Sequence, residues 1–177
     1  MAEMSSDAVV RLWNDQLNRR LVDLIHATTS HEKLGGITAI DYLLEVHQDN
    51  TPETKRNLFR LYNYVKTLLP CADINVMIAA SKTLGSIAEY GGTSFADHFV
   101  AFEVPKAVQQ LQGDKDQAKY AAVLILRELA RHSPSHFFQF VPLVLDKIWI
   151  PLRDPRVKIL FMINRVFVEP SILGCSP

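Results

Sequence analysis

The sequence predicts an all-α protein in which antiparallel helical hairpins stack side by side into a solenoid. Three observations support this prediction. Apolar residues recur at helical rather than alternating spacing, proline and glycine mark short breaks between the helical segments, and one residue pattern recurs at an interval within the roughly 40–47 residues typical of helical repeats. The connections between segments are only a few residues long, so neighbouring helices should be antiparallel.

The first segment displays the helical spacing. Its apolar residues fall on one broad stripe, formed by Val9, Leu12, Trp13, Leu17, Leu21, Leu24 and Ile25. The opposite face is charged and carries Arg11, Asp15, Arg19, Arg20 and Asp23. This pattern predicts an amphipathic helix over 6–28.

Capping residues mark most of the helix boundaries. A side-chain oxygen precedes a first-turn proline at Thr51-Pro52, Ser133-Pro134 and Asp154-Pro155. Two pairs fit the spacing of a capping box, Ser94 with Asp97 and Asp114 with Gln117. Glycines that should end helices are Gly91, Gly92 and Gly113. Together these signals predict helices over 6–28, 32–47, 52–69, 74–90, 94–111, 115–132, 134–150 and 155–168.

Two of the predicted helices contain an internal proline. Pro105 lies inside 94–111, and Pro142 lies inside 134–150. Each proline removes one backbone hydrogen bond, so each should kink or split its helix.

An internal repeat indicates how the hairpins are arranged. Three segments begin with two small residues and have large aliphatic residues five and eight positions after the first of them. The segments begin at Gly35, Ala79 and Ala121, which are 44 and 42 residues apart. This period is typical of HEAT and armadillo repeats, and we expect three to four HEAT-like hairpins. We name the patterned positions the repeat-core residues: Gly35, Gly36, Ile40, Leu43, Ala79, Ala80, Leu84, Ile87, Ala121, Ala122, Leu126 and Leu129.

The physical reason for the pattern is that one hairpin cannot bury both of its apolar faces alone. The small pair should lie where the second helix of a hairpin closely approaches another backbone. The aliphatic residues should fill the shared core. Asp73, Asp116 and Asp154 precede or begin second helices, where a negative charge suits the helix dipole.

Composition argues against several classes of function. The chain has 177 residues, of which 48% are hydrophobic, and 19 basic residues balance 19 acidic ones. Zero net charge argues against a dedicated nucleic-acid or anionic-membrane binder. No apolar leader or membrane-spanning run is found. We therefore expect a cytoplasmic protein, with any contact to endomembranes made through its partners.

The candidates for metal binding and nucleophilic catalysis are better explained as structural residues. His132 and His136 have a spacing that can bind a metal on one helix, but Ser133-Pro134 should start a new helix between them. We interpret both as polar residues between helices. Cys71 lacks a CxxC partner, and nothing pairs it with a base, so we expect a reduced, partly buried thiol.

Other polar groups also have structural explanations. Gly91-Gly92 before a helix could cradle a phosphate, but no lysine follows and no strand precedes, which favours a turn between hairpins. Arg127, Glu128 and Arg131 are interpreted as surface charges, with a ladder between repeats as the alternative. A basic strip on one helix is interpreted as solvated surface, with contact to an acidic partner as the alternative: Lys55, Arg56, Arg60 and Lys66. We find no catalytic, cofactor-binding or metal-binding set.

The repeats resemble a specific family. The segments Gly35-Gly36-Ile37-Thr38-Ala39-Ile40, Met77-Ile78-Ala79-Ala80-Ser81-Lys82, Ala121-Ala122-Val123-Leu124-Ile125-Leu126-Arg127-Glu128-Leu129-Ala130 and Trp149-Ile150-Pro151-Leu152-Arg153-Asp154-Pro155 resemble, in this order, the extreme N-terminal HEAT repeats of the target-of-rapamycin (TOR) protein kinases. The resemblance covers roughly residues 7–157. It implies a solenoid that carries partner subunits of a TOR complex, with the kinase domain near the opposite end of the full protein.

The resemblance ends after Val157. Residues 158–168 contain no alanine, whereas the family continues with a helix rich in Ala, Arg and Glu, and residues 169–177 have no helical pattern. We therefore divide the chain into a HEAT-like solenoid, 1–157, and a divergent tail, 158–177. We interpret the tail as read-through of an unspliced intron or a truncated gene model. A genuine terminal cap is the alternative, although a cap should have a polar outer face.

We expect a protein-interaction scaffold that is the N-terminal segment of a TOR-like serine/threonine kinase, acting in growth and nutrient signalling. Its expected partners are TOR complex subunits or the remainder of the solenoid, with no nucleic acid and no small-molecule substrate. The chain lacks the glycine-rich loop and the HRD and DFG motifs of kinases, so no enzymatic activity is expected of it. A HEAT adaptor of the nuclear-transport or phosphatase-regulatory type is the second hypothesis, and a free-standing helical enzyme is the third.

Overall fold

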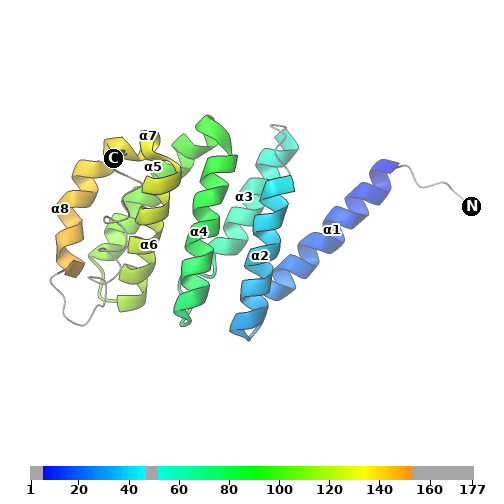
Figure 1. The fold of residues 1–177 in the computed structure, drawn as a ribbon, viewed down its shortest axis with the longest axis horizontal. Helices are drawn as coiled ribbons and strands as arrows, with labels where there is room; N and C mark the ends of the chain where they lie inside the picture. The colour runs from blue at the N-terminus through cyan, green and yellow to red at the C-terminus, as the bar shows by residue number, and fades with distance from the viewer. Residues whose placement is uncertain (1–5, 47–51, 153–177) are drawn as a thin grey trace, which may run out of the picture.

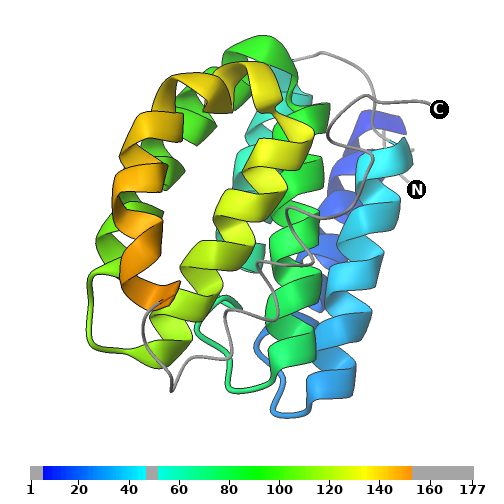
Figure 2. The same cartoon turned by 60° about the vertical axis from the view of Figure 1, so that its left-hand side comes forward.

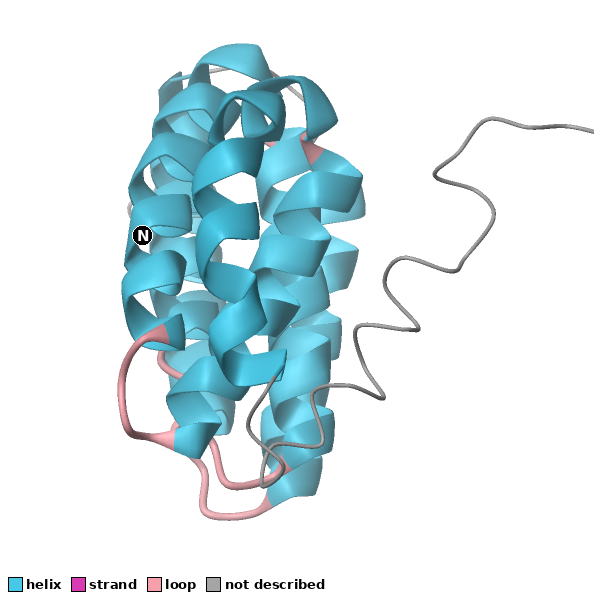
Figure 3. Ribbon diagram, turned by 90° about the vertical axis from the view of Figure 1, so that its left-hand side faces the viewer, coloured by secondary structure: helices cyan, strands magenta, loops and turns pink. Residues whose placement is uncertain are grey.

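The computed structural model describes residues 6–46 and 52–152, and every regular element in these ranges is a helix (Figure 3). The predicted all-α class is therefore confirmed. The elements are α1 (Ser6–Ile25), α2 (Ser30–Val46), α3 (Pro52–Lys66), α4 (Ile74–Tyr90), α5 (Gly92–Leu111), α6 (Asp116–His132), α7 (Pro134–Phe137), the short 3-10 helix η1 (Phe138–Phe140) and α8 (Val141–Leu152).

The helices form two layers. Antiparallel hairpins α1–α2, α3–α4 and α5–α6 stack from one end of the molecule to the other (Figure 1). In one layer α4 packs between α2 and α6, and in the other layer α8 lies against α5 (Figure 2). This arrangement is the α-solenoid that the repeat predicts, because each hairpin buries its apolar faces against the next one.

The core is continuous through the stack. Leucine, isoleucine and valine side chains between the layers are almost completely shielded from solvent, as at Leu21, Ile40, Val65, Ile87 and Leu111. The rings of Phe95, Phe99 and Tyr62 extend this core between α3 and α5. The hydrophobic cluster thus joins residues of every hairpin and holds the stack together.

Local sequence explains several helix boundaries. Asp73 caps α4, since its carboxylate accepts a hydrogen bond from the Asn75 backbone N–H at 2.8 Å. An N-cap hydrogen bond that was not predicted begins α2: the backbone N–H of Glu32 donates to the Thr29 hydroxyl, which donates to the Glu32 carboxylate. Gly91 and Gly92 form the turn between α4 and α5, and Gly92 has a φ of 71° that suits glycine.

Two predicted capping boxes are wrong. Helix α5 begins at Gly92, so Ser94 lies within its first turn rather than at its N-cap. Helix α6 begins at Asp116, with Lys115 at the N-cap position instead of Asp114. The backbone of the turns, rather than a side-chain cap, therefore determines where α5 and α6 begin. The helix predicted over 155–168 lies outside the described residues.

The two internal prolines behave differently. Helix α5 runs unbroken from Gly92 to Leu111 through Pro105, so this proline does not split its helix. The segment predicted over 134–150 is split into α7, η1 and α8, and Pro142 is the second residue of α8. There its missing N–H leaves no hydrogen bond unmade, because the first backbone N–H groups of a helix have no partner within it.

Candidate functional site

The small pairs of the repeat lie on α2, α4 and α6. Their second member is fully or almost fully buried in each hairpin: Gly36, Ala80 and Ala122. A methyl group added to Gly36 would stand 3.0 Å from the Cβ of Leu24 on α1, which defines a close approach of the two helices. The first members vary, since Ala121 is buried, Ala79 is half-buried, and Gly35 is exposed with open space beside it.

The aliphatic repeat-core residues point mostly into the core. Five are buried: Ile40, Leu84, Ile87, Leu126 and Leu129. Leu43 is half-buried and packs against the same cluster. These side chains fill the space between the layers, so this set has a packing role.

No metal-binding cluster is found among the described residues. His132 ends α6 and His136 lies in α7, and Ser133 and Pro134 separate them as predicted. Each ring contacts a carboxylate of an earlier helix. His132 contacts Glu89 of α4, and His136 lies 3.5 Å from the Asp97 carboxylate of α5. Both histidines therefore link helices, as the sequence indicates.

The contact between α4 and α6 depends on a glycine. Gly85 is buried inside α4, and a Cβ placed on it would stand 2.6 Å from Cδ2 of His132 and 3.0 Å from the Cβ of Glu128. Both of these residues are on α6. Gly85 thus allows α6 to approach α4 closely enough for a polar network to form between them.

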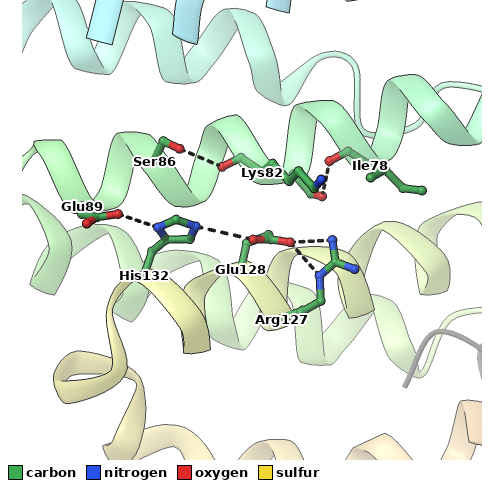
Figure 4. Close-up of polar contacts among 8 residues, drawn as sticks. Ile78, Lys82, Ser86, Glu89, Arg127, Glu128 and His132 are labelled. Atoms are coloured by element: carbon green, nitrogen blue, oxygen red, sulfur yellow. Dashed lines mark hydrogen bonds and ion pairs between the residues drawn. The ribbon is translucent and has the colours of Figure 1, made fainter. Parts of the chain in front are cut away.

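That network runs along the junction (Figure 4). The Nδ1 atom of His132 lies 2.6 Å from the Glu89 carboxylate, and its Nε2 atom lies 3.6 Å from the Glu128 carboxylate. Arg127 donates from Nε to the other Glu128 oxygen at 2.6 Å. We name these four residues the α4–α6 clamp: Glu89, Arg127, Glu128 and His132.

Burial and charge shift two pKa values in the clamp. The pKa of His132 is raised, chiefly by its contact with buried Glu128 and further by Glu89, although burial of the ring opposes this. Burial alone would raise the pKa of Glu128, but His132 and Arg127 lower it.

The clamp corrects the interpretation of Arg127 and Glu128 as surface charges. The Glu128 side chain is only 2% exposed and lies between two helices. A buried carboxylate needs its partners, because an unpaired charge in the interior is strongly destabilising. Sequence reasoning missed the clamp, although a glycine inside a helix often indicates close packing.

A second polar cluster joins α3 to α5. The Tyr62 hydroxyl and the Lys66 ammonium both donate to one oxygen of Glu103, and the Lys66 distance is 2.8 Å. Glu103 is 3% exposed, so these two donors compensate a buried charge. Burial alone would lower the pKa of Lys66, but the bonds to Glu103 and Tyr62 raise it. Burial and the bond to Glu103 also raise the pKa of Tyr62.

The predicted basic strip lies on α3. Arg56 and Arg60 are exposed, whereas Lys55 and Lys66 are half-buried.

Cys71 is half-buried between α3 and α4, as predicted, and packs against the core. None of the described helices is long and apolar enough to cross a membrane.

The fold and these junctions define an α-solenoid whose helices carry structural polar networks. By sequence, the chain is similar to serine/threonine-protein kinase tor1 of Schizosaccharomyces pombe (40% identity over 155 residues, 87% of this chain) and TOR2 of Saccharomyces cerevisiae (39% over 164 residues, 88%). The TOR kinase of Arabidopsis thaliana is 33% identical over 159 residues, 89% of this chain. No protein-family model matches.

The chain is therefore a homologue of one segment of the TOR serine/threonine kinases, as its repeats predict. It spans only 6% of the length of each of these relatives. The kinase motifs that the relatives' names imply are absent from this sequence.

We predict that Ala122→Leu destabilises the fold by about 1–3 kcal/mol, because the larger side chain overpacks a fully buried position. Urea unfolding followed by circular dichroism measures this change. An unchanged unfolding free energy would show that the small pair does not mark a close helix contact.

We also predict that Gly85→Ala is destabilising, whereas Gly35→Ala is not. Both changes gain about 1 kcal/mol of helix propensity. Only the methyl group at position 85 would meet His132 and Glu128, and this overpacking should lower the free energy of unfolding by about 1–3 kcal/mol. Thermal unfolding of the two variants tests this, and equal melting temperatures would contradict it.

The clamp should make stability depend on pH. Because folding raises the pKa of His132, its contribution is complete below 6.5, the ordinary histidine value, and is lost as pH rises through the folded pKa. Folding lowers the pKa of Glu128, so that contribution is present above the ordinary value of 4.5 and is lost as pH falls through the folded pKa.

The test is the difference in unfolding free energy between the natural chain and His132→Gln, measured as pH increases above 6.5. The difference should shrink as pH rises. A difference that stays constant would mean that His132 is not charged in the folded clamp.

Proposed function

We propose that this chain is a protein-interaction scaffold, the N-terminal HEAT segment of a TOR-like serine/threonine kinase that acts in TOR complex assembly and in growth and nutrient signalling. The observation that carries the proposal is the identity of 40% with a TOR kinase over 87% of the chain. The fold supports it, because a stack of hairpins uses its inner faces for packing and leaves its outer helix faces for partners.

Two buried carboxylates support a scaffold rather than an active site. The buried carboxylates Glu103 and Glu128 are each neutralised by cations or donors from the same junction. A catalytic acid or base would instead need to reach a substrate. The chain's partners on this proposal are TOR complex subunits or the remainder of the solenoid, and its location is the cytoplasm.

The division of the chain after Val157 is part of the proposal. Residues 158–177 lie outside the described residues, and we propose that they are not family sequence. Transcript reads that cross the codons of 157–159 test this. Reads that join these codons with no alternative exon would contradict it.

We predict that this chain can replace the matched segment of the fission yeast tor1 kinase. The chimera should assemble with the same subunits as tor1 and keep its kinase activity, because the helix packing is shared. A chimera that carries both Gly85→Ala and Ala122→Leu should lose subunits, since both changes disturb the contact surfaces of α6. Co-purification followed by mass spectrometry is the measurement.

Deletion of the matched segment provides the opposing control. If the deleted kinase assembles and phosphorylates as tor1 does, the segment has no scaffolding role.

The purified chain by itself should transfer no phosphate from ATP to a protein substrate. The reason is that its sequence has no glycine-rich loop, HRD or DFG motif. A radiolabelled kinase assay measures this, and turnover that persists through further purification would contradict the scaffold proposal.

A further inference from the structure

The outer side of the α3–α5 contact carries exposed aromatic rings. Phe59 on α3 is 49% exposed and Phe102 on α5 is 63% exposed. The ring of Phe59 rests on Phe95 with centroids 4.7 Å apart, so its position is fixed by the core. Exposed apolar side chains mark an interaction surface where they gather, and these two rings lie on adjacent helices.

The same surface is basic. Helix α3 contains Lys55, Arg56, Arg60 and Lys66 but only one acidic residue, Glu53, whereas the whole chain has no net charge. Among the described residues, neither Lys55 nor Arg56 has an ion-pair partner. Their charges are therefore available to a partner.

Two lysines lie near the exposed ring of Phe102. Lys66 lies 2.8 Å from Glu103, and its ammonium also lies over the rings of Tyr62 and Phe102, at 4.7 and 5.1 Å from their centroids. Lys106 follows Phe102 by four residues on α5, so the two lie on the same helix face. Burial, and then the neighbouring Lys66 charge, lower the pKa of Lys106.

We propose that this surface binds an acidic segment of a partner protein, with carboxylates at Lys55, Arg56 and Lys106 and an apolar side chain against Phe59 and Phe102. We name the surface the basic aromatic strip: Lys55, Arg56, Phe59, Lys66, Phe102 and Lys106. The proposal rests on the scaffold function and adds the chemical class of the partner. Aromatic residues and arginine are enriched at protein interfaces, and Phe59, Phe102 and Arg56 supply both kinds.

The charge of the chain favours an acidic protein segment as the partner, rather than a nucleic acid or an anionic membrane. A nucleic-acid site usually extends over a strongly basic domain, and this chain has equal numbers of basic and acidic residues. An anionic membrane attracts clusters of basic residues, but it would leave the two separated rings without a shaped contact. A peptide supplies carboxylates and an apolar side chain together.

The test begins with selection from a random-peptide phage library on the full chain. The selected peptides should be rich in Asp and Glu around an aromatic or aliphatic residue. Fluorescence anisotropy then gives the dissociation constant of one selected peptide, which should rise with salt because the contact is largely ionic.

Two variants locate the binding surface. Lys55→Glu with Arg56→Glu should weaken peptide binding by about tenfold or more, since like charges then oppose the peptide. Phe102→Ala should also weaken it, and its exposure means that the fold is retained. The matched control is Lys82→Glu with Lys115→Glu, which makes the same charge change at exposed positions in α4 and before α6. Circular dichroism confirms the fold of each variant.

Several results would overturn the proposal. These are a selection that enriches no acidic peptides, equal binding by the α3 variant and its control, and stronger binding to phosphatidylserine vesicles or to an oligonucleotide than to the peptide. Each would refute only the class of partner, because the tor1 chimera decides separately whether the segment is a scaffold.

Discussion

The structure depends on how closely the helices of one layer can approach each other. A hairpin such as α3–α4 leaves apolar residues on both sides, so it must pack against neighbours on both sides. Gly85 on α4 lets the Glu128 and His132 side chains of α6 approach closely within one layer, and buried Gly36 on α2 does the same for Leu24 of α1 across the layers. Larger residues at these positions would force the packed helices apart and expose the hydrophobic core that the stack buries.

Close approach also determines where charges can be buried. Glu128 on α6 is neutralised by Arg127 and by His132, which in turn reaches Glu89 on α4. Glu103 on α5 is similarly held by Tyr62 and Lys66 of α3. Such networks are specific rather than strongly stabilising, because removing charges from water offsets much of the attraction between them. They join neighbouring hairpins through contacts between α4 and α6 and between α3 and α5.

The two layers have different functional consequences. The layer of α2, α4 and α6 uses small residues and the clamp for internal packing. The contact between α3 and α5 leaves Phe59, Phe102 and several cations towards solvent. A scaffold requires both properties, a rigid stack and exposed side chains that a partner can recognise.

The sequence by itself determined the all-α class, most of the helix boundaries, the stacking of hairpins and the relationship to TOR kinases. Helical spacing, proline positions and the 44- and 42-residue intervals are local or periodic, so they can be read directly. The helix over 74–90 agrees with α4 at both ends because Asp73 and Gly91 are adjacent capping residues.

Only the tertiary structure decided which polar residues act together. Gly85 and Glu128 are 43 positions apart in sequence, as are Glu89 and His132. Nothing local distinguishes buried Glu128 from a surface glutamate. The same holds for Tyr62, Lys66 and Glu103, and for the position of Phe102 beside the basic residues of α3. These contacts follow from the rotation and spacing of packed helices, which depend on all the side chains between them.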